Sequence, residues 1–239
     1  MSINFLTFGS HDNYIDAANR ISNQAKKLNI FDTINIYTGD DLKNDNDFWD
    51  KHGTFIENNK IGYGYWIWKP YLIYKTIEKL NDGDLLLYLD SGCEICNEEK
   101  IYMLEHINFV KKYKILGTRT DKTSEYNCNK MDLINLFNIN PEELDMFQIQ
   151  ATIVFLEVSH FFKNLIKVWY ELACNYHYID ESPSIISHPN NKKFIVHRND
   201  QSIFSLLIKK YNLYNLFRHE LSLLCIKCSR NRSGIAYFN

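Results

Sequence analysis

The sequence has little of several features that would assign it to a special class of protein. Its 239 residues include only four Pro and nine Gly, and these are scattered along the chain without an internal repeat or low-complexity block. This argues against a fibrous or largely disordered chain. Hydrophobic residues make up 45% and charged residues 23%, the balance of a globular protein that can bury a sizeable core.

The sequence also lacks an excess of charge of one sign and a long apolar run. The net charge is −2, so the basic excess that non-specific nucleic-acid binding requires is missing. No stretch approaches the ~20 apolar residues of a membrane helix, and the N-terminus has no signal-peptide pattern. We therefore expect a cytoplasmic protein with no nucleic-acid partner and no transmembrane segment. Nothing in the sequence indicates an oligomeric state.

Six cysteines are present, and four of them form two C-x-x-C pairs, Cys93 with Cys96 and Cys225 with Cys228. Such pairs can hold zinc. However, the two pairs lie far apart in the sequence, and the first overlaps the end of a predicted strand. We prefer free thiols in a reducing compartment and keep a zinc site as the alternative.

Predicted strands and helices alternate along the chain. Short apolar runs predict strands at 3–8, 33–38, 85–89, 115–118 and 153–158. Apolar positions spaced three and four apart, with capping residues, predict helices at 13–28, 71–80, 101–112, 161–175 and 199–210. Residues 40–50 are polar and predict a loop or a short surface helix. This order predicts an α/β fold, with a mainly parallel central sheet and helices on both faces.

We expect one domain over residues 1–239. Its nucleotide-binding half would cover about residues 1–120 and its acceptor half about residues 121–239. In such sheets ligands bind beyond the carboxyl ends of the strands.

Asp90 follows Leu85–Leu89, the continuously apolar run of a strand covered on both faces. A carboxylate at this strand end can hold a divalent cation that neutralises a diphosphate. Ser91 and Gly92 form a turn that a ligand can approach closely, and Glu94 is a possible second metal ligand. The alternative is that Asp90 only caps the turn.

Lys69 precedes Pro70 and a helix that leads into the Asp90 strand. A cation beside the free N–H groups of a helix N-terminus makes a phosphate site, so Lys69 and Asp90 could reach one ligand. The alternative is a packed aromatic cluster, because three large aromatics lie just before Lys69.

The helix with Lys69, the Gly83-Asp84 turn and the strand ending in Asp90-Ser91-Gly92 resemble the core of GT-A fold glycosyltransferases with a DXD sugar-binding motif. The resemblance implies transfer of a sugar from a nucleoside diphosphate sugar to a hydroxyl acceptor on a glycan, glycoprotein or glycolipid. It also implies Mn²⁺ or Mg²⁺ and retention of anomeric configuration, and we favour a UDP-sugar over a GDP-sugar. Gly92 departs from the motif because the family has a second Asp there, so metal binding would depend on Asp90 with Glu94.

The resemblance implies further donor contacts. Thr7 and Tyr14 lie in and beside the loop after the first strand, where such enzymes hold the nucleotide base, and Tyr14 could stack on that base. Gln148 and Gln150 would lie on one strand face, where they could contact sugar. A helix-start aromatic and a solvated strand edge are the alternative interpretations.

Asp180 and Glu181 lie in the turn IDESPS and could orient an acceptor hydroxyl or act as a general base. A solvated turn is the alternative. With Asp200, they are the candidates for the base that an inverting reaction would need.

The run His197-Arg198-Asn199-Asp200-Gln201 resembles a donor-side or acceptor-side segment of the same enzymes. His197 could complete the metal site with Asp90 and Glu94, with His188 as a weaker candidate, and Arg198 could bind phosphate bidentately. Asp200 and Gln201 could be catalytic, or Asp200 could only cap the following helix.

A non-catalytic nucleotide-sugar or sugar-binding protein on the same fold is the main alternative function. The replacement of the second motif Asp by Gly92 is its best support.

Overall fold

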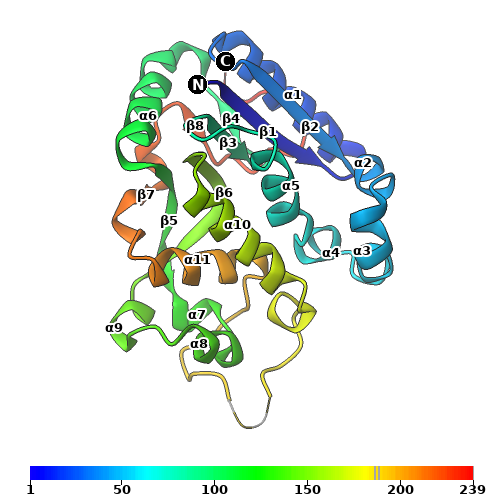
Figure 1. Cartoon of the computed structure of the whole chain (residues 1–239), viewed down its shortest axis with the longest axis vertical. Helices are drawn as coiled ribbons and strands as arrows, with labels where there is room; N and C mark the ends of the chain where they lie inside the picture. The colour runs from blue at the N-terminus through cyan, green and yellow to red at the C-terminus, as the bar shows by residue number, and fades with distance from the viewer. Residues whose placement is uncertain (186, 188, 239) are drawn as a thin grey trace.

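A six-stranded sheet crosses the molecule in the computed structural model, which describes residues 1–185, 187 and 189–238 (Figure 1). The strand order is β2-β1-β3-β6-β5-β7. β6 runs antiparallel to both of its neighbours, and the other adjacent pairs are parallel. The strands are β1 (Ile3–Gly9), β2 (Thr33–Thr38), β3 (Leu85–Leu89), β5 (Ile115–Ser124), β6 (Phe147–Glu157) and β7 (Phe217–His219).

Long helices cover both faces of this sheet (Figure 1). α1 (Asp12–Leu28) and α6 (Lys100–Tyr113) pack on the face to which Leu85, Leu87 and Leu89 point. On the face with Leu86 and Tyr88 lie α5 (Trp68–Ile77), α10 (His160–Ala173) and α11 (Asp200–Lys210). The predicted α/β class, with a mainly parallel sheet between two helical layers, is confirmed.

Shorter elements fill the connections between these layers. The helices are α2 (Gly39–Lys43), α3 (Asn46–Asn58), α4 (Gly62–Tyr65), α7 (Glu125–Cys128), α8 (Met131–Phe137) and α9 (Pro141–Leu144). The 3₁₀ turns are η1 (Asn97–Glu99), η2 (Tyr176–Tyr178), η3 (Tyr214–Leu216) and η4 (Glu220–Ser222). β4 (Glu94–Ile95) and β8 (Ile226–Lys227) form a separate antiparallel pair. The polar stretch at residues 40–50 therefore carries α2 and the start of α3.

α1 illustrates why the predicted helices form. Ile21, Ala25 and Leu28 are spaced four and three apart and are at most 1% exposed, so they make one apolar stripe against the sheet. The helix ends at Asn29, whose φ of 50° is left-handed, as is common at helix C-termini. Lys26 and Lys27 in its last turn favour the negative end of the helix dipole.

Two strands extend well beyond their predicted lengths. β6 begins at Phe147 and contains Gln148 and Gln150. Because its first half is polar, the apolar pattern predicted only the second half of the strand. β5 likewise continues past Thr118 into a polar stretch. None of the helices in the described residues is long and apolar enough to cross a membrane.

Candidate functional site

β3 delivers Asp90 to the carboxyl end of the sheet. Its five residues are all 0% exposed, which fixes the strand between the two helical layers. Side chains alternate along a strand, so Asp90 follows Leu86 and Tyr88 onto the face with α5, α10 and α11. The Asp90 N–H donates to Thr152 O of β6 at 3.0 Å. The Asp90 side chain stays 29% exposed, so a ligand can reach it.

Lys69, in the first turn of α5, lies behind Asp90. Its side chain is only 4% exposed, and its Nζ is 3.0 Å from Asp90 Oδ1 and 3.6 Å from Asp200 Oδ2. The same Nζ donates to Ala151 O at 3.3 Å, and the Tyr88 hydroxyl donates to Asp90 Oδ1 at 2.6 Å. We call Lys69, Tyr88, Asp90 and Asp200 the Lys69 cluster.

Charge keeps Lys69 protonated. Burial lowers its pKa, but the two carboxylates outweigh burial and raise it above its ordinary value. Lys69 was predicted to bind phosphate directly, and this role does not fit its position. The ammonium is enclosed and already lies against two carboxylates, so it positions Asp90 instead of facing a ligand.

Asp200 is the incompletely satisfied member of the cluster, and it follows a residue with a strained backbone. Burial and the negative charge of Asp90 raise its pKa to about 7, although Lys69 opposes this. Asp200 Oδ2 is buried without a hydrogen-bond partner, because its 3.6 Å separation from Lys69 Nζ is an ion pair too long for a hydrogen bond. Asn199 precedes it at φ 54° and ψ −126°, a backbone conformation that L-residues rarely adopt.

A left-handed turn places α5 and therefore Lys69. Every residue of Gly62–Trp66 has a φ between 52° and 81°, so α4 is a turn of left-handed helix. Two glycines adopt this backbone readily, but each of its three aromatic residues costs about 1–2 kcal/mol. The Trp68 indole N–H donates to Gly62 O at 2.9 Å and helps to hold the turn. Strain of this kind persists mainly at ligand sites.

The predicted metal ligands Asp90, Glu94 and His197 do not come together. Among the described residues, no group of three His, Cys, Asp or Glu side chains could hold a metal ion. Glu94 is 0% exposed, and its oxygens accept hydrogen bonds from Ser229, Asn231 and two backbone N–H groups near the C-terminus. The expected three-ligand set is therefore wrong, and Asp90 remains as the one carboxylate that could bind a cation alongside donor phosphates.

His197 is a structural residue in this arrangement. Its Nε2–H donates to Tyr178 O at 2.7 Å, and its Nδ1 faces the Lys130 N–H at 3.4 Å. Burial lowers its pKa to about 4, so the ring is neutral and both nitrogens are used. His188, the weaker candidate for the metal role, lies outside the described residues.

The predicted donor contacts near β1 and β3 differ in how far a ligand could reach them. Thr7 is 0% exposed and its hydroxyl donates to Leu89 O at 2.9 Å, so it joins the two strands and does not face a ligand. Ser91 is 7% exposed. Gly92 O accepts a hydrogen bond from the Asn231 N–H at 3.0 Å. Tyr14 is half-buried, with its ring beneath the guanidinium of Arg232 at 5.5 Å.

The glutamines connect β6 to its neighbours. Gln201 Nε2 donates to Gln148 Oε1 at 2.7 Å, and Gln201 Oε1 accepts from the Ala151 N–H at 3.3 Å. Gln150 Nε2 donates to Glu220 Oε2 at 3.3 Å. Gln201 therefore fixes the first turn of α11, and with it Asp200, against β6. Arg198 is exposed and lies beside the Cys128 thiol.

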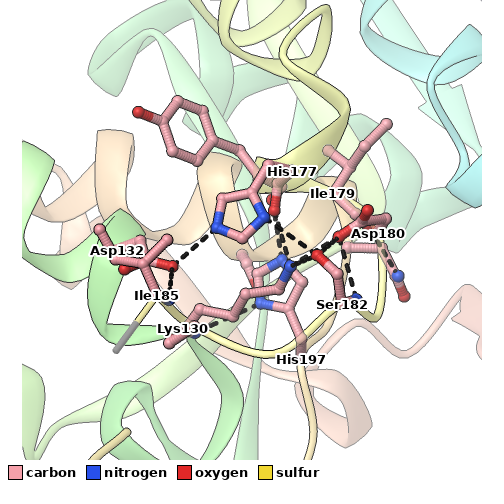
Figure 2. A network of polar contacts seen from close by, with 12 residues as sticks. Lys130, Asp132, His177, Ile179, Asp180, Ser182, Ile185 and His197 are labelled. Atoms are coloured by element: carbon pink, nitrogen blue, oxygen red, sulfur yellow. Dashed lines mark hydrogen bonds and ion pairs between the residues drawn. The ribbon is translucent and has the colours of Figure 1, made fainter. Parts of the chain in front are cut away.

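Asp180 belongs to a second network around a buried lysine, Lys130 (Figure 2). Lys130 Nζ lies 2.7 Å from Asp180 Oδ1, 2.7 Å from His177 O and 3.2 Å from the Ser182 hydroxyl. The Ser182 hydroxyl also donates to Asp180 Oδ1 at 2.5 Å. We call Lys130, His177, Asp180 and Ser182 the Lys130 network.

The Lys130 network makes Asp180 a poor base. Burial raises the Asp180 pKa, but hydrogen bonds from Lys130 and Ser182 outweigh burial and lower it below its ordinary value. Glu181 next to it is exposed. Of the residues predicted as catalytic, only Asp200 belongs to the Lys69 cluster.

Two features of the site were missed. Tyr88 stands two residues before Asp90 and so shares its face, a signal that the strand pattern LLLYLD contained. The contacts of Glu94 with the last residues of the chain had no local signal, because they join segments more than 130 positions apart.

The two C-x-x-C pairs do meet across β4 and β8. The neighbouring Cys228 thiol and burial raise the pKa of Cys93, and the Cys96 N–H donates to Cys225 O at 2.9 Å. All six cysteines are free. Because no three metal-ligating side chains gather in the described residues, the zinc alternative is not supported.

Comparison with known proteins finds similar folds at low identity. One is a glycosyltransferase involved in the glycosylation of the major capsid of PBCV-1, at 12% identity and a TM-score of 0.43 over 82% of each chain. Mouse xyloside xylosyltransferase 1 in its apo form has 12% identity and a TM-score of 0.41, over 92% of this chain and 84% of that one. Mannose-6-phosphate isomerase from Helicobacter pylori has 11% identity and a TM-score of 0.37, over 82% of this chain and 97% of that one.

No protein family and no curated protein matches the chain. At these identities and TM-scores, function has to be argued from the residues of the site.

Proposed function

We propose that this protein is a glycosyltransferase that moves a sugar from a nucleoside diphosphate sugar to a hydroxyl acceptor. The observation that carries the proposal is Asp90, a partly exposed carboxylate at the carboxyl end of β3, held from behind by Lys69 and Tyr88. Ligands of α/β sheets bind at this edge. Sugar hydroxyls donate strong hydrogen bonds to carboxylates. A fixed negative charge also favours the oxocarbenium-like state of glycosyl transfer.

Asp90 is the catalytic residue in this proposal, because it is the exposed member of the cluster. Lys69 and Asp200 are positioning residues, since their side chains are each 4% exposed. Lys69 restricts Asp90 to one rotamer. Asp200, with a pKa of about 7, is partly protonated near neutral pH and so limits the negative charge that accumulates around Asp90.

We further propose retention, with the departing diphosphate as the base. The acceptor oxygen forms a bond to the anomeric carbon, the bond from that carbon to phosphate oxygen breaks, and the hydroxyl proton passes to that oxygen. Two of the three side chains considered as bases support this choice by their positions. Asp180 is bound to Lys130, and Asp200 is buried against Lys69. Glu181 is exposed and is the remaining rival.

The donor and metal remain proposals. We favour a UDP-sugar over a GDP-sugar, with an acceptor on a glycan, glycoprotein or glycolipid. Mn²⁺ or Mg²⁺ would find one protein carboxylate here, Asp90, and would need the donor phosphates and water for its other ligands. We therefore assign no step of the reaction to a metal.

Calorimetry with UDP- and GDP-sugars, with and without Mn²⁺, tests the proposal. We expect one donor class to bind the wild-type protein, Asp90→Asn to abolish that binding and Asp180→Asn to preserve it. The proposal fails if no nucleotide-sugar binds at millimolar concentration.

Turnover then separates an enzyme from a binding protein. We expect slow donor hydrolysis without acceptor, detected as release of the nucleoside diphosphate. Binding without hydrolysis or transfer would instead favour the non-catalytic alternative.

A further inference from the structure

The last residues of the chain run from the turn after β3 along α1. We call residues 229–238 the C-terminal strap. Arg20 of α1, only 5% exposed, joins the strap to the turn after Asp90. Its Nη1 donates to Asn231 O at 3.0 Å and Ser233 O at 2.6 Å. Its Nη2 donates to Ser91 O at 2.7 Å and Cys93 O at 2.8 Å.

Glu94 makes a second attachment. Its Oε1 accepts from the Ser229 hydroxyl at 2.9 Å and the Asn231 side-chain amide at 3.0 Å. Its Oε2 accepts from the Tyr237 N–H at 2.8 Å and the Phe238 N–H at 3.2 Å. Burial raises the pKa of Glu94, but these hydrogen bonds outweigh burial and lower it, so the carboxylate stays ionised. A buried Arg and a buried Glu therefore hold the strap in one place.

The strap carries two exposed arginines. A methyl group placed on Gly92 would lie 3.4 Å from the Cα of Arg230, so Arg230 stands directly against the turn that follows Asp90. The Arg232 guanidinium lies over the Tyr14 ring at the start of α1. Neither arginine forms an ion pair with any acid in the described part of the chain.

The diphosphate of a donor needs cations that Lys69 does not supply. Lys69 is enclosed and neutralised by Asp90 and Asp200, and the nearby acids Asp12 and Asp16 of α1 add negative charge. Arginine binds phosphate oxygens bidentately and remains charged at any physiological pH. Parallel strands β1 and β3 are neighbours whose connections leave in opposite directions, which is the place where such sheets bind nucleotides.

We infer that Arg230 and Arg232 of the C-terminal strap bind the diphosphate of the donor, beside Asp90 and Tyr14. This deepens the proposed function and rests on it for the nucleotide and sugar. The shared chemistry is a diphosphate, which can come from a nucleoside diphosphate or from pyrophosphate. The strap is thus part of the donor site, and Arg20 and Glu94 are positioning residues for it.

Calorimetry on the full chain tests this inference with UDP, GDP, the nucleosides uridine and guanosine, and inorganic pyrophosphate as probes. The variant is Arg230→Ala/Arg232→Ala. The matched control is Lys112→Ala/Arg218→Ala, which removes two exposed cations that also lie over aromatic rings. Arg218 is on β7, separated from β3 by β6 and β5. Circular dichroism and a thermal melt establish that each variant is folded.

We expect the strap variant to bind the preferred nucleoside diphosphate and pyrophosphate about tenfold more weakly for each arginine removed, because each lost charge-assisted contact is worth roughly 1.4 kcal/mol or more. Nucleoside binding should not change, and the control variant should match the wild type. Equal diphosphate affinity in the strap variant and the wild type would overturn the inference.

Failure of the proposed function gives a different result. The wild type would then bind pyrophosphate through the strap, with loss in the strap variant, but would bind neither UDP nor GDP more tightly than pyrophosphate. That outcome leaves the strap as a diphosphate site and removes the nucleotide-sugar donor. Absence of pyrophosphate, UDP and GDP binding alike would overturn both.

Discussion

Lys69 and Lys130 are both enclosed by the protein, and each contacts a carboxylate that reaches the surface. Their side chains are 4% and 2% exposed, and those of their partners Asp90 and Asp180 are 29% and 26% exposed. The two clusters therefore look alike in burial and charge. They differ in how completely their polar atoms are satisfied.

The Lys130 network is complete around its ammonium. Lys130 Nζ has three hydrogen-bond acceptors within 3.2 Å, and Asp180 is ionised easily because its pKa is lowered. The Lys69 cluster instead contains a buried oxygen of Asp200 without a hydrogen bond and a carboxyl pKa of about 7. A satisfied network stabilises a fold, whereas an unsatisfied one with a perturbed pKa is typical of a ligand site. We therefore assign function to the Lys69 cluster and a structural role to the Lys130 network.

Replacing Lys130 by methionine should mainly lower stability, whereas replacing Lys69 by methionine should mainly lower activity. Lys130→Met should lower the free energy of unfolding by about 3 kcal/mol, because it leaves Asp180 and the His177 carbonyl without their buried cation. Lys69→Met should destabilise less, since Asp200 can take up a proton and become neutral, but it should lower transferase activity about 100-fold by releasing Asp90.

Urea unfolding and donor turnover, measured on both variants and corrected for the folded fraction, check this pair. A Lys130→Met protein that is as stable as wild type but inactive would reverse the assignment of the two clusters.

The pH dependence of stability should separate the two aspartates. Asp200 has a folded pKa of about 7, above its ordinary value of 3.8, so the native state binds the extra proton between these pH values. Its contribution to stability therefore falls as pH rises from about 4 to 7, with a slope of at most about 1.4 kcal/mol per pH unit. Asp200→Asn removes this slope, so the stability of the variant relative to wild type should increase as pH rises from about 4 to 7.

Asp180 should behave in the opposite sense. Its folded pKa is lowered from 3.8, so its stabilisation is present above that pH and is lost as pH falls through the folded pKa. Asp180→Asn should therefore be less stable than wild type above pH 4 and converge with it in stronger acid. Burial lowers the pKa of His197 to about 4, so the ring is neutral in the fold above that pH and cancels in the differences there. Denaturant unfolding from about pH 2 to 8 measures these slopes, and parallel curves for the three proteins over that whole range would contradict both assignments.

The smallest effect is expected at Glu181. Its side chain is exposed and lies next to the Lys130 network, so Glu181→Gln should change turnover less than about threefold and stability by at most about 0.5 kcal/mol. Steady-state kinetics with saturating acceptor provide the check. A loss of 100-fold or more would make Glu181 the general base and would favour inversion over retention.

Much of the fold and the centre of the site could be predicted from local pattern. The apolar run Leu85–Leu89 predicted β3 with its bounds, and the position of Asp90 at its end followed from the general rule for ligand sites in such sheets. The α1 stripe was equally clear. β6 was predicted too short because Gln148 and Gln150 are polar residues whose hydrogen bonds to α11 and η4 only the tertiary fold reveals.

The roles of charged residues were harder to predict because burial is a tertiary property. The sequence predicted that Lys69 is a phosphate-binding cation, but in the fold the carboxylates at the end of β3 and the start of α11 enclose it. The sequence predicted that Glu94 is a metal ligand, but in the fold its carboxylate accepts four hydrogen bonds from residues near the end of the chain. Sequence position identified which residues carry charge near the site, but not which of them remain free to meet a ligand.

The most direct test of the central claim is a comparison of donor turnover in Asp90→Asn and Asp180→Asn. Both substitutions remove one partly exposed carboxylate from a buried lysine and preserve its shape. We predict that Asp90→Asn lowers kcat/KM for the nucleotide-sugar by about 100-fold or more, the size of effect seen when one preorganised electrostatic group is lost. Asp180→Asn, corrected for folded fraction, should stay within about threefold of wild type. Wild-type turnover in Asp90→Asn, together with inactivity in folded Asp180→Asn, would contradict the account.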